Sequence, residues 1–162
     1  MKPVLFLFLA CLLAFPAQAA RRVGEAQVRA DANNRPCFTI SEREERRSGA
    51  PNFHAITVTG SGHLLWHMAM PRGRTFPVAF SMCIPYAGRV PALPQTPFAP
   101  LEAGKVYIVQ IDSRPGKGST APLRYQARFC LAPRPEGGST VVQIGADQRP
   151  GRNLYGCLPG SA

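Results

Sequence analysis

The stretch between Lys105 and Leu131 constrains the fold of this chain more than any other. Two runs of strand-forming residues, Lys105–Ile111 (KVYIVQI) and Leu123–Leu131 (LRYQARFCL), flank a connection rich in Gly, Pro and Ser. The second run alternates between bulky and polar side chains, which is typical of a sheet that is buried on one face. The first run is apolar on both faces, as expected at the centre of a sheet. The stretch therefore predicts an antiparallel hairpin in the middle of a β fold.

Further short strands are predicted on both sides of this hairpin. Alternating runs bounded by turn residues occupy Gly24–Ile40, which holds two strands, and Phe53–Thr59, Leu64–Met70, Val78–Ile84 and Thr140–Ile144. Seven or eight such strands, without an amphipathic helix of useful length, indicate an all-β chain. We predict a small antiparallel β-sandwich, immunoglobulin-like, stapled by two disulfides. It forms a single domain over residues 20–162.

Three segments are predicted to lack regular structure. The segment Ser41–Pro51 (SEREERRSGAP) mixes charges without an apolar stripe, so we interpret it as a solvated loop. The segment at 85–100 (PYAGRVPALPQTPFAP) is too rich in proline for a central strand, because proline lacks the amide donor. We interpret it as an extended loop, which is either a passive crossover or a rigid recognition surface. The third is a C-terminal tail at 146–162.

The N-terminus has the features of a secretory signal peptide over residues 1–19. Lys2 supplies the positive charge, Val4–Phe15 the apolar run, and Ala17–Ala19 a small-x-small cleavage site. We therefore expect a mature chain that begins at Ala20 in the periplasm. The apolar run is too short to span a bilayer, and no later segment is long enough.

Four cysteines follow the predicted signal, and an even number in an oxidising compartment favours two disulfides: Cys37, Cys83, Cys130 and Cys157. Three pairings are possible. We favour Cys37 with Cys83 and Cys130 with Cys157, because the second bridge would tie down the tail. The first three cysteines lie opposite the bulky residues of their predicted strands, so we expect the bridges to staple the strands from outside. Cys11 lies too early in the apolar run for us to expect lipid anchoring.

The chain carries a net charge of +10 at pH 7, mostly from arginine. Such a charge suits an acidic protein partner, an anionic component of the envelope or nucleic acid, and it does not by itself choose among them. We expect a protein partner and no nucleic acid. The candidate contacts are arginines on loops or on the solvated sheet face: Arg43, Arg46, Arg47, Arg72, Arg74, Arg114, Arg124 and Arg128.

The residues that often carry catalysis are not arranged for it. His63 and His67 lie four apart on a predicted strand, where about 13 Å would separate them at roughly 3.3 Å per residue, too far for one metal ion. The loop Gly116–Thr120 lacks the first glycine of a phosphate-binding loop and a following helix. The acidic residues are clustered in one charged segment or scattered, so they offer no pair for general acid and base. We expect no catalytic site, cofactor or metal.

The strand residues resemble a family of small exported bacterial proteins, mostly lipoproteins, that are assigned as type VI secretion immunity proteins. The resemblance rests on these motifs: Ala26-x-Val28, Asp31-x-Asn33, Cys37-Phe38-x-Ile40, Cys83-Ile84, Gly104-Lys105-x-Tyr107 and Tyr125-x-Ala127-x-Phe129. It implies a pairing of the early and middle cysteines, Cys37 with Cys83. This chain departs from the family in lacking an acylation cysteine and in having the proline-rich loop and a cysteine-bearing tail.

The leading hypothesis is a non-catalytic periplasmic inhibitor that binds a toxin or another envelope-targeted enzyme, as the resemblance implies. Two alternatives belong to other classes. One is a secreted hydrolase or toxin with a site that the sequence does not reveal, which purified protein would show by degrading peptidoglycan, lipid or nucleic acid. The other is a structural envelope module that binds anionic polymer through charge, and its binding would weaken with salt.

Overall fold

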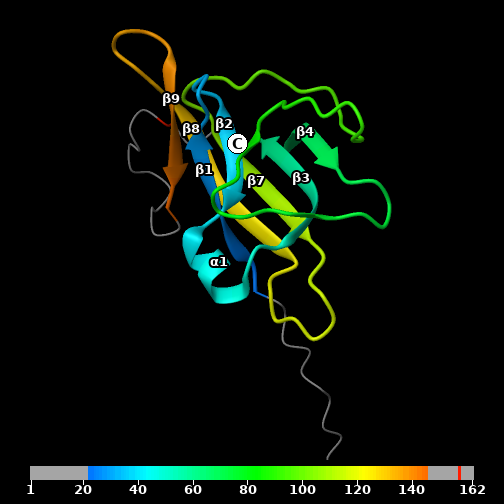
Figure 1. Cartoon of the computed structure of the whole chain (residues 1–162). Coiled ribbons are helices and arrows are strands. Elements are labelled where there is room, and N and C mark those ends of the chain that lie inside the picture. Colours follow the sequence, from blue (N-terminus) through cyan, green and yellow to red (C-terminus); the bar gives the residue numbers. More distant parts are fainter. Residues whose placement is uncertain (1–21, 146–156, 158–162) are drawn as a thin grey trace, which may run out of the picture.

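The computed structural model describes residues 22–145 and Cys157. The predicted signal peptide, Cys11 and the rest of the predicted tail lie outside the described residues. Within them, the chain forms the following elements (Figure 1): β1 (Gly24–Ala30), β2 (Pro36–Ile40), α1 (Glu42–Ser48), β3 (Asn52–Gly60), β4 (His63–Ala69), β5 (Phe76–Pro77), β6 (Ile84–Pro85), β7 (Val106–Ser113), β8 (Arg124–Pro133) and β9 (Ser139–Ile144). The all-β prediction is confirmed. No helix in this part of the chain has the length and apolarity needed to cross a membrane.

The predicted central hairpin is confirmed. Strands β7 and β8 pair antiparallel, with Tyr107 opposite Phe129, and β3 pairs with the other edge of β7. The alternating residues of β7 are buried at Tyr107, Val109 and Ile111. The alternation of β8 holds to Phe129 and then changes, because Cys130 is buried as well.

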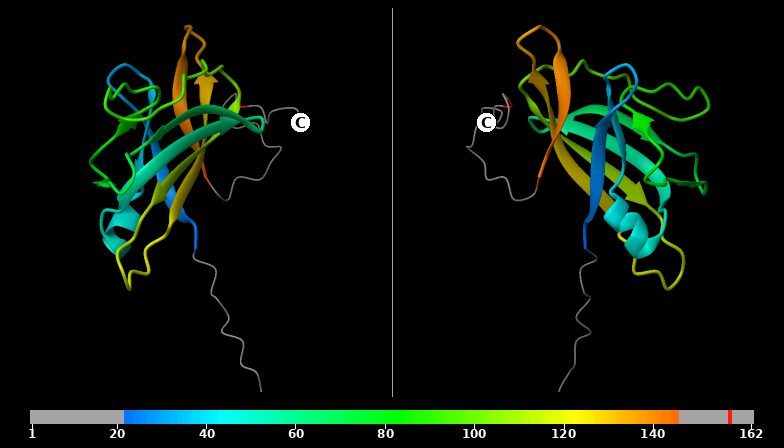
Figure 2. Two further views of the ribbon diagram at one scale, coloured as in Figure 1. Left: turned by 90° about the vertical axis from the view of Figure 1, so that its right-hand side faces the viewer. Right: turned by 60° about the vertical axis from the view of Figure 1, so that its left-hand side comes forward.

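The sheet divides at β8. The start of β1 pairs with β8 in parallel, whereas β9 pairs with the rest of the same edge in antiparallel fashion. A Cβ atom on Gly24 would lie 2.6 Å from Cε1 of the Tyr125 ring and closer still to Cδ1, so only glycine fits where β1 meets β8. Figure 2 shows β9 and the β1–β2 hairpin diverging from this point. The Gln143 side chain bridges them, accepting from the Val28 amide at 2.7 Å.

This topology differs in part from the prediction. The strands make one hydrogen-bonded path in the order β4-β3-β7-β8-β1-β2-β6, so two separate sheets of an immunoglobulin-like sandwich are not confirmed. Strand β1 pairs with β8 only at its start and with β2 along most of its length, and β2 packs against the inner face of β8. The ring of Phe38 lies 5.5 Å from that of Phe129 and 6.5 Å from that of Tyr86, centroid to centroid. These rings belong to the hydrophobic core, to which β1, β2, β3, β4, β7 and β8 all contribute. Each fully buried aromatic side chain contributes roughly 1.5–3 kcal/mol by leaving water.

The segment predicted as a solvated loop after Ile40 contains a helix, α1. The Ser41 hydroxyl accepts a hydrogen bond from the Glu44 amide at 3.3 Å, and the Gly49 amide donates to the Glu45 carbonyl at 2.7 Å with φ 73°. Acidic residues occupy the first turn and basic residues the last, which complements the helix dipole. The loop prediction was wrong because this helix has seven residues and buries only Glu44, so it needs no apolar stripe.

The predicted strand at 78–84 is also wrong. Strand β5 ends at Pro77, β6 begins at Ile84, and a turn lies between them, with the Met82 amide donating to the Ala79 carbonyl. Tertiary contacts override the local alternation: the Phe80 amide donates to the Glu45 carboxylate of α1 at 3.0 Å, and the Arg29 guanidinium lies 3.9 Å from the centre of the Phe80 ring.

Both favoured disulfides are present. The Cα atoms are 5.4 Å apart in Cys37–Cys83 and 6.0 Å apart in Cys130–Cys157. The expected position outside the core was wrong, because Cys37, Cys130 and Cys157 are buried and only Cys83 is exposed. Alternation of side chains between the two faces of a strand did not predict this burial. Strand β2 is buried on both faces, and Cys130 packs with Cys157 in a second small cluster. Two disulfides fit an oxidising, extracytoplasmic compartment.

Candidate protein-binding surface

The arginines predicted as partner contacts fall into separate regions. Those at 72 and 74 are exposed on the turn between β4 and β5. Arg46 forms an ion pair with Glu42 on α1 at 3.1 Å, and Arg114 lies beside His54, with 3.2 Å between their nitrogens. Arg124 pairs with Asp112 on the sheet. The last three arginines, on α1 and β8, line a groove that is described below: Arg43, Arg47 and Arg128.

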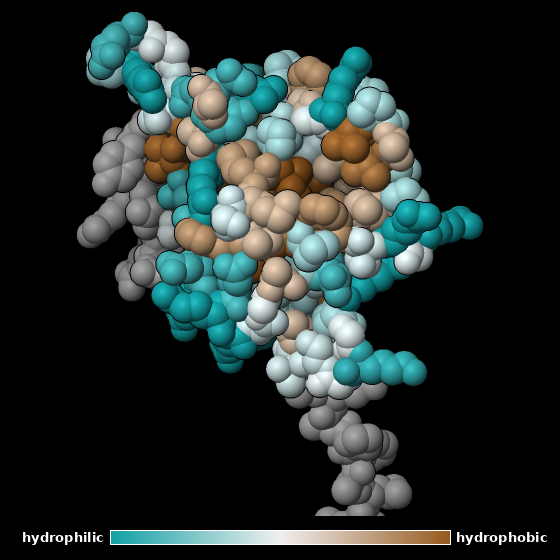
Figure 3. Space-filling view, viewed as in Figure 1, coloured by the Kyte–Doolittle hydropathy of each residue, from teal (hydrophilic) through white to brown (hydrophobic). Residues whose placement is uncertain are grey.

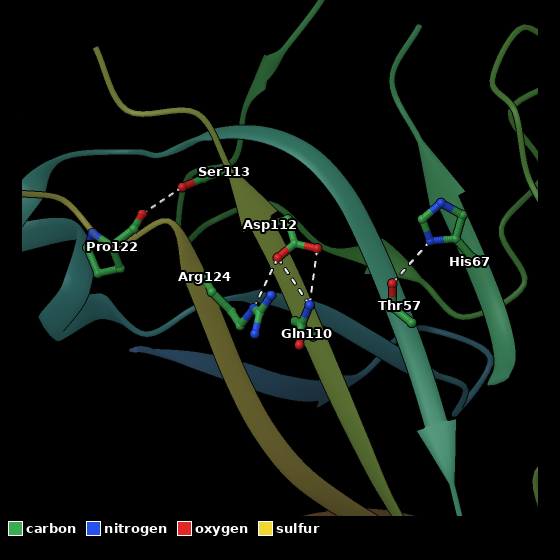
Figure 4. Close-up of polar contacts among 7 residues, drawn as sticks. All are labelled: Thr57, His67, Gln110, Asp112, Ser113, Pro122 and Arg124. Carbon is green, nitrogen blue, oxygen red and sulfur yellow. Dashed lines mark hydrogen bonds and ion pairs between the residues drawn. The ribbon is translucent and has the colours of Figure 1, made fainter. Parts of the chain in front are cut away.

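Polar side chains on the solvated face of the sheet form hydrogen bonds with one another (Figure 4). The Asp112 carboxylate accepts from Arg124 Nε at 3.3 Å and from Gln110 Nε2 at 3.1 Å. On the neighbouring strands, Thr57 Oγ1 lies 3.1 Å from Nδ1 of His67. These side chains satisfy one another within the sheet. In the part of the chain that the structure describes, no group of three or more His, Cys, Asp or Glu side chains is placed to hold a metal ion.

A groove of about 400 Å³ lies between β4 and the segment from β5 to the proline-rich loop, and its lining is almost entirely apolar. We call it the apolar groove. Phe76 and Val90 stand at its rim with 45% and 42% of their surfaces exposed. The residues that line it are Phe53, Met68, Met70, Phe76, Cys83, Ile84, Pro85, Val90 and Leu93.

The proline-rich loop forms one wall of this groove because it is hydrogen-bonded along the edge of β4. The Ala69 amide donates to the Pro94 carbonyl, and the Thr96 amide donates to the His67 carbonyl, each at 2.9 Å. The loop thus crosses from β6 to β7 and also covers a sheet edge that would otherwise be open. It is a fixed wall of the surface as well as a crossover.

Tyr86 anchors the start of the same loop. Its hydroxyl donates to the Ala99 carbonyl at 2.6 Å, and its ring packs 5.5 Å from Trp66 and 6.3 Å from Phe98, centroid to centroid. Burial, which disfavours the charged phenolate, raises the pKa of Tyr86 to about 12. The hydroxyl therefore stays a hydrogen-bond donor throughout the physiological pH range.

Two further hollows extend the apolar groove across the same side of the molecule. One of about 410 Å³ shares Met68, Ile84, Pro85 and Val90 with it. Another of about 320 Å³ continues past Ala87 to Phe98, which is 59% exposed. Figure 3 shows hydrophobic residues crossing the middle of this side as a band, with hydrophilic residues around it. We call the groove and these two hollows together the apolar face.

Positive charges surround the apolar face. Arg72 and Arg74 lie on the turn that joins two groove residues, Met70 and Phe76, and Arg89 lines the adjoining hollow. Among the described residues, none of these three arginines forms an ion pair with a carboxylate. Sequence analysis predicted the first two but missed Arg89 and the apolar residues, although the proline-rich loop was considered as a recognition surface.

A second groove, of about 720 Å³, lies where β1 leaves β8. We call it the basic groove, because its lining includes Arg22, Arg43, Arg47 and Arg128. Sequence analysis missed Arg22, because its partner Glu44 lies on α1, which was interpreted as a solvated loop.

Glu44 accepts a hydrogen bond from Arg22 Nη1 at 2.7 Å. Burial alone would raise the pKa of the Glu44 carboxyl, but the hydrogen bond and charge of Arg22 outweigh it, so the pKa is lowered. The same hydrogen bond raises the pKa of Arg22. The pair fixes the segment before β1 to the helix.

The arrangement combines a preformed apolar recess, a cationic rim and a distant basic groove. No family model, curated protein or solved structure matches this chain.

Proposed function

We propose that this protein is a non-catalytic periplasmic binding protein that neutralises a toxin or another envelope-targeted enzyme, in the manner of a type VI secretion immunity protein. The apolar face is the surface that binds the partner. The observation that carries the proposal is the apolar groove with exposed Phe76 and Val90, beside Arg72 and Arg74, which form no ion pair with the residues that the structure describes.

The composition of this surface suits a protein partner. Protein interfaces have an apolar core and a polar rim, and aromatic residues, Met and Arg are enriched in them. Contiguous apolar patches on monomeric proteins are small unless they bind something. Phe76, Met68 and Met70 supply the core here, and the arginines of the 71–75 turn supply the rim. An acidic partner with a protruding apolar side chain is complementary to both.

The backbone around the groove is ordered before binding. The proline-rich loop is hydrogen-bonded to β4, and Cys83, which lines the groove, is joined to Cys37 of β2. A preformed wall loses little conformational entropy when a partner docks. The net charge of +10 for the full chain, which becomes about +9 when Lys2 leaves with the predicted signal peptide, further speeds association with an acidic partner. Both features suit an inhibitor that must capture its target quickly and hold it.

The proposal is tested by co-expressing the exported protein with a toxin encoded beside its gene. Wild type should protect cells, and the Phe76→Ser/Val90→Ser variant should lose protection together with at least tenfold in affinity for the purified toxin, about 1.4 kcal/mol. Leu64→Ser and Leu123→Ser are matched controls, because these residues are at least as exposed, at 55% and 46%, but lie outside the apolar face. Protection that survives the groove variant, or that no version of the protein confers, would overturn the proposal.

A further inference from the structure

We propose that the basic groove is a binding site for a ligand that carries at least two oxyanion groups, phosphate or carboxylate. This site lies apart from the apolar face and shares no lining residue with it. It does not rest on the proposed function.

The groove collects like charges from separate parts of the fold. Arg22 precedes β1, Arg43 and Arg47 lie on α1, and Arg128 lies on β8. Positions 43 and 47 are four apart on the helix, where like charges destabilise an isolated helix slightly. Arg47, in the last turn, complements the helix dipole, but Arg43 lies outside that turn and gains nothing from it. The fold adds a further positive charge from the sheet.

Most of this charge is not neutralised within the described residues. Glu44 is engaged by Arg22, which leaves Glu25 as the other carboxylate in the lining. None of Arg43, Arg47 and Arg128 forms an ion pair there, whereas Arg46 on the same helix pairs with Glu42. The groove thus holds more guanidinium groups than carboxylates.

The size and lining of the groove indicate the class of ligand. A volume of about 720 Å³ matches small-molecule sites, which span about 300–1,000 Å³. The guanidinium fork binds planar or tetrahedral oxyanions with two parallel hydrogen bonds. The exposed Gln126 side chain adds neutral donors. None of the described residues that line the groove is aromatic, so they offer no platform for stacked nucleobases.

The extent of the groove favours a multivalent anion over a single one. Its arginines come from three parts of the chain, the segment before β1, the helix α1 and strand β8, and they line a volume of about 720 Å³, far more than one phosphate or carboxylate group fills. A linear or branched anion with two or more such groups can engage several of these arginines at once. The oxyanion groups of the ligand are either phosphates or carboxylates, and the experiment below distinguishes the two.

The test titrates the purified protein with inorganic tripolyphosphate, with citrate and with inorganic monophosphate, using calorimetry at physiological salt. Tripolyphosphate or citrate should bind at least tenfold more tightly than monophosphate, and the tighter of the two identifies the source. The Arg43→Gln/Arg47→Gln variant and the Arg128→Gln variant should each weaken that binding at least tenfold. Thermal unfolding with and without the anion confirms that each variant is folded.

Two matched controls remove the same charge elsewhere. Arg46→Gln lies on the same helix outside the groove, and Arg72→Gln/Arg74→Gln lies beside the apolar face. Both should stay within twofold of wild type. Equal losses in controls and groove variants would show attraction to overall charge, and absence of saturable binding would show no site. Either result overturns the proposal.

Discussion

The apolar groove and the basic groove are built in different ways. The apolar groove is lined by residues of β3 and β4 together with short segments, β5, β6 and part of the proline-rich loop, and its shape depends on a disulfide and on loop hydrogen bonds. The basic groove is lined mainly by α1, β1, β7, β8 and the end of β9, and neither disulfide joins two of these elements to each other. The comparison teaches that irregular segments can form a rigid recess when cross-links replace the regular ladder.

Loss of the Cys37–Cys83 bridge should give the largest difference between the two grooves, because it should weaken binding at the apolar groove alone. The bridge joins residues 46 apart, so Cys37→Ala/Cys83→Ala should lower the free energy of unfolding by about 4 kcal/mol. Because Cys83 lines the apolar groove, we expect weaker binding of the protein partner but unchanged binding of tripolyphosphate at temperatures where the variant is folded. Urea denaturation and the two binding assays measure this.

The second bridge is the matched comparison for that prediction. Cys130→Ala/Cys157→Ala opens a link between residues 27 apart, with an expected loss of about 3.5 kcal/mol. It should leave the apolar groove intact, since neither cysteine lines it. Equal loss of partner binding in both variants would contradict the view that the first bridge shapes the groove.

Acid should affect the basic groove through Glu44. Its pKa is lowered in the folded protein, so the ion pair with Arg22 contributes its full stability above the unfolded pKa, about 4.5, and loses it as pH falls through the lower folded pKa. Glu44→Gln should cost about 1–2 kcal/mol at neutral pH, a value reduced by the partial exposure of Arg22, and should flatten the acid dependence. Urea midpoints from neutral pH to about pH 3 measure it.

Glu42→Gln is the control for the acid prediction, because Glu42 forms an exposed pair with Arg46 on the same helix. Exposed helix pairs contribute about 0.3–0.5 kcal/mol, so its curve should follow wild type closely. Parallel acid curves for wild type and Glu44→Gln would show that the buried pair is not what titrates.

The smallest expected effect belongs to Tyr86. Tyr86→Phe removes the hydrogen bond to the Ala99 carbonyl and should cost about 1 kcal/mol, while the ring contacts with Trp66 and Phe98 remain. Because this bond holds the loop of the apolar face, partner binding should weaken a few-fold and tripolyphosphate binding should not change. Chemical denaturation and the same two assays test this.

Tyr107→Phe is the comparison, because its hydroxyl also bonds backbone, accepting from the Glu102 amide at 2.7 Å, but lies outside the apolar face. It should lose similar stability and keep partner binding. A weaker partner affinity in Tyr107→Phe than in Tyr86→Phe would contradict the role of the loop anchor.

Local signals explain where prediction from sequence succeeded and where it failed. The helix α1 was predictable, since Ser41 three residues before Glu44 and Gly49 after the last turn are capping signals, but the absence of an apolar stripe was given more weight. The alternation at 78–84 indicated a strand, and contacts from α1 and β1 to Phe80 prevented it. Propensity is a weak guide when distant residues compete for the same backbone groups.

The sequence alone indicated the all-β character, the central hairpin and the presence of two disulfides, because alternation, turn residues and an even number of cysteines can be read from the chain itself. Only the structure shows which of the three possible pairings forms. The sequence also identified the arginines as candidate contacts, but it did not show which of them would lie in the same groove. Only the tertiary structure placed Arg43 and Arg47 beside Arg128 and separated them from Arg72 and Arg74. The division of the sheet at β8 and the course of the proline-rich loop decide these neighbours, and both depend on contacts between residues far apart in the chain.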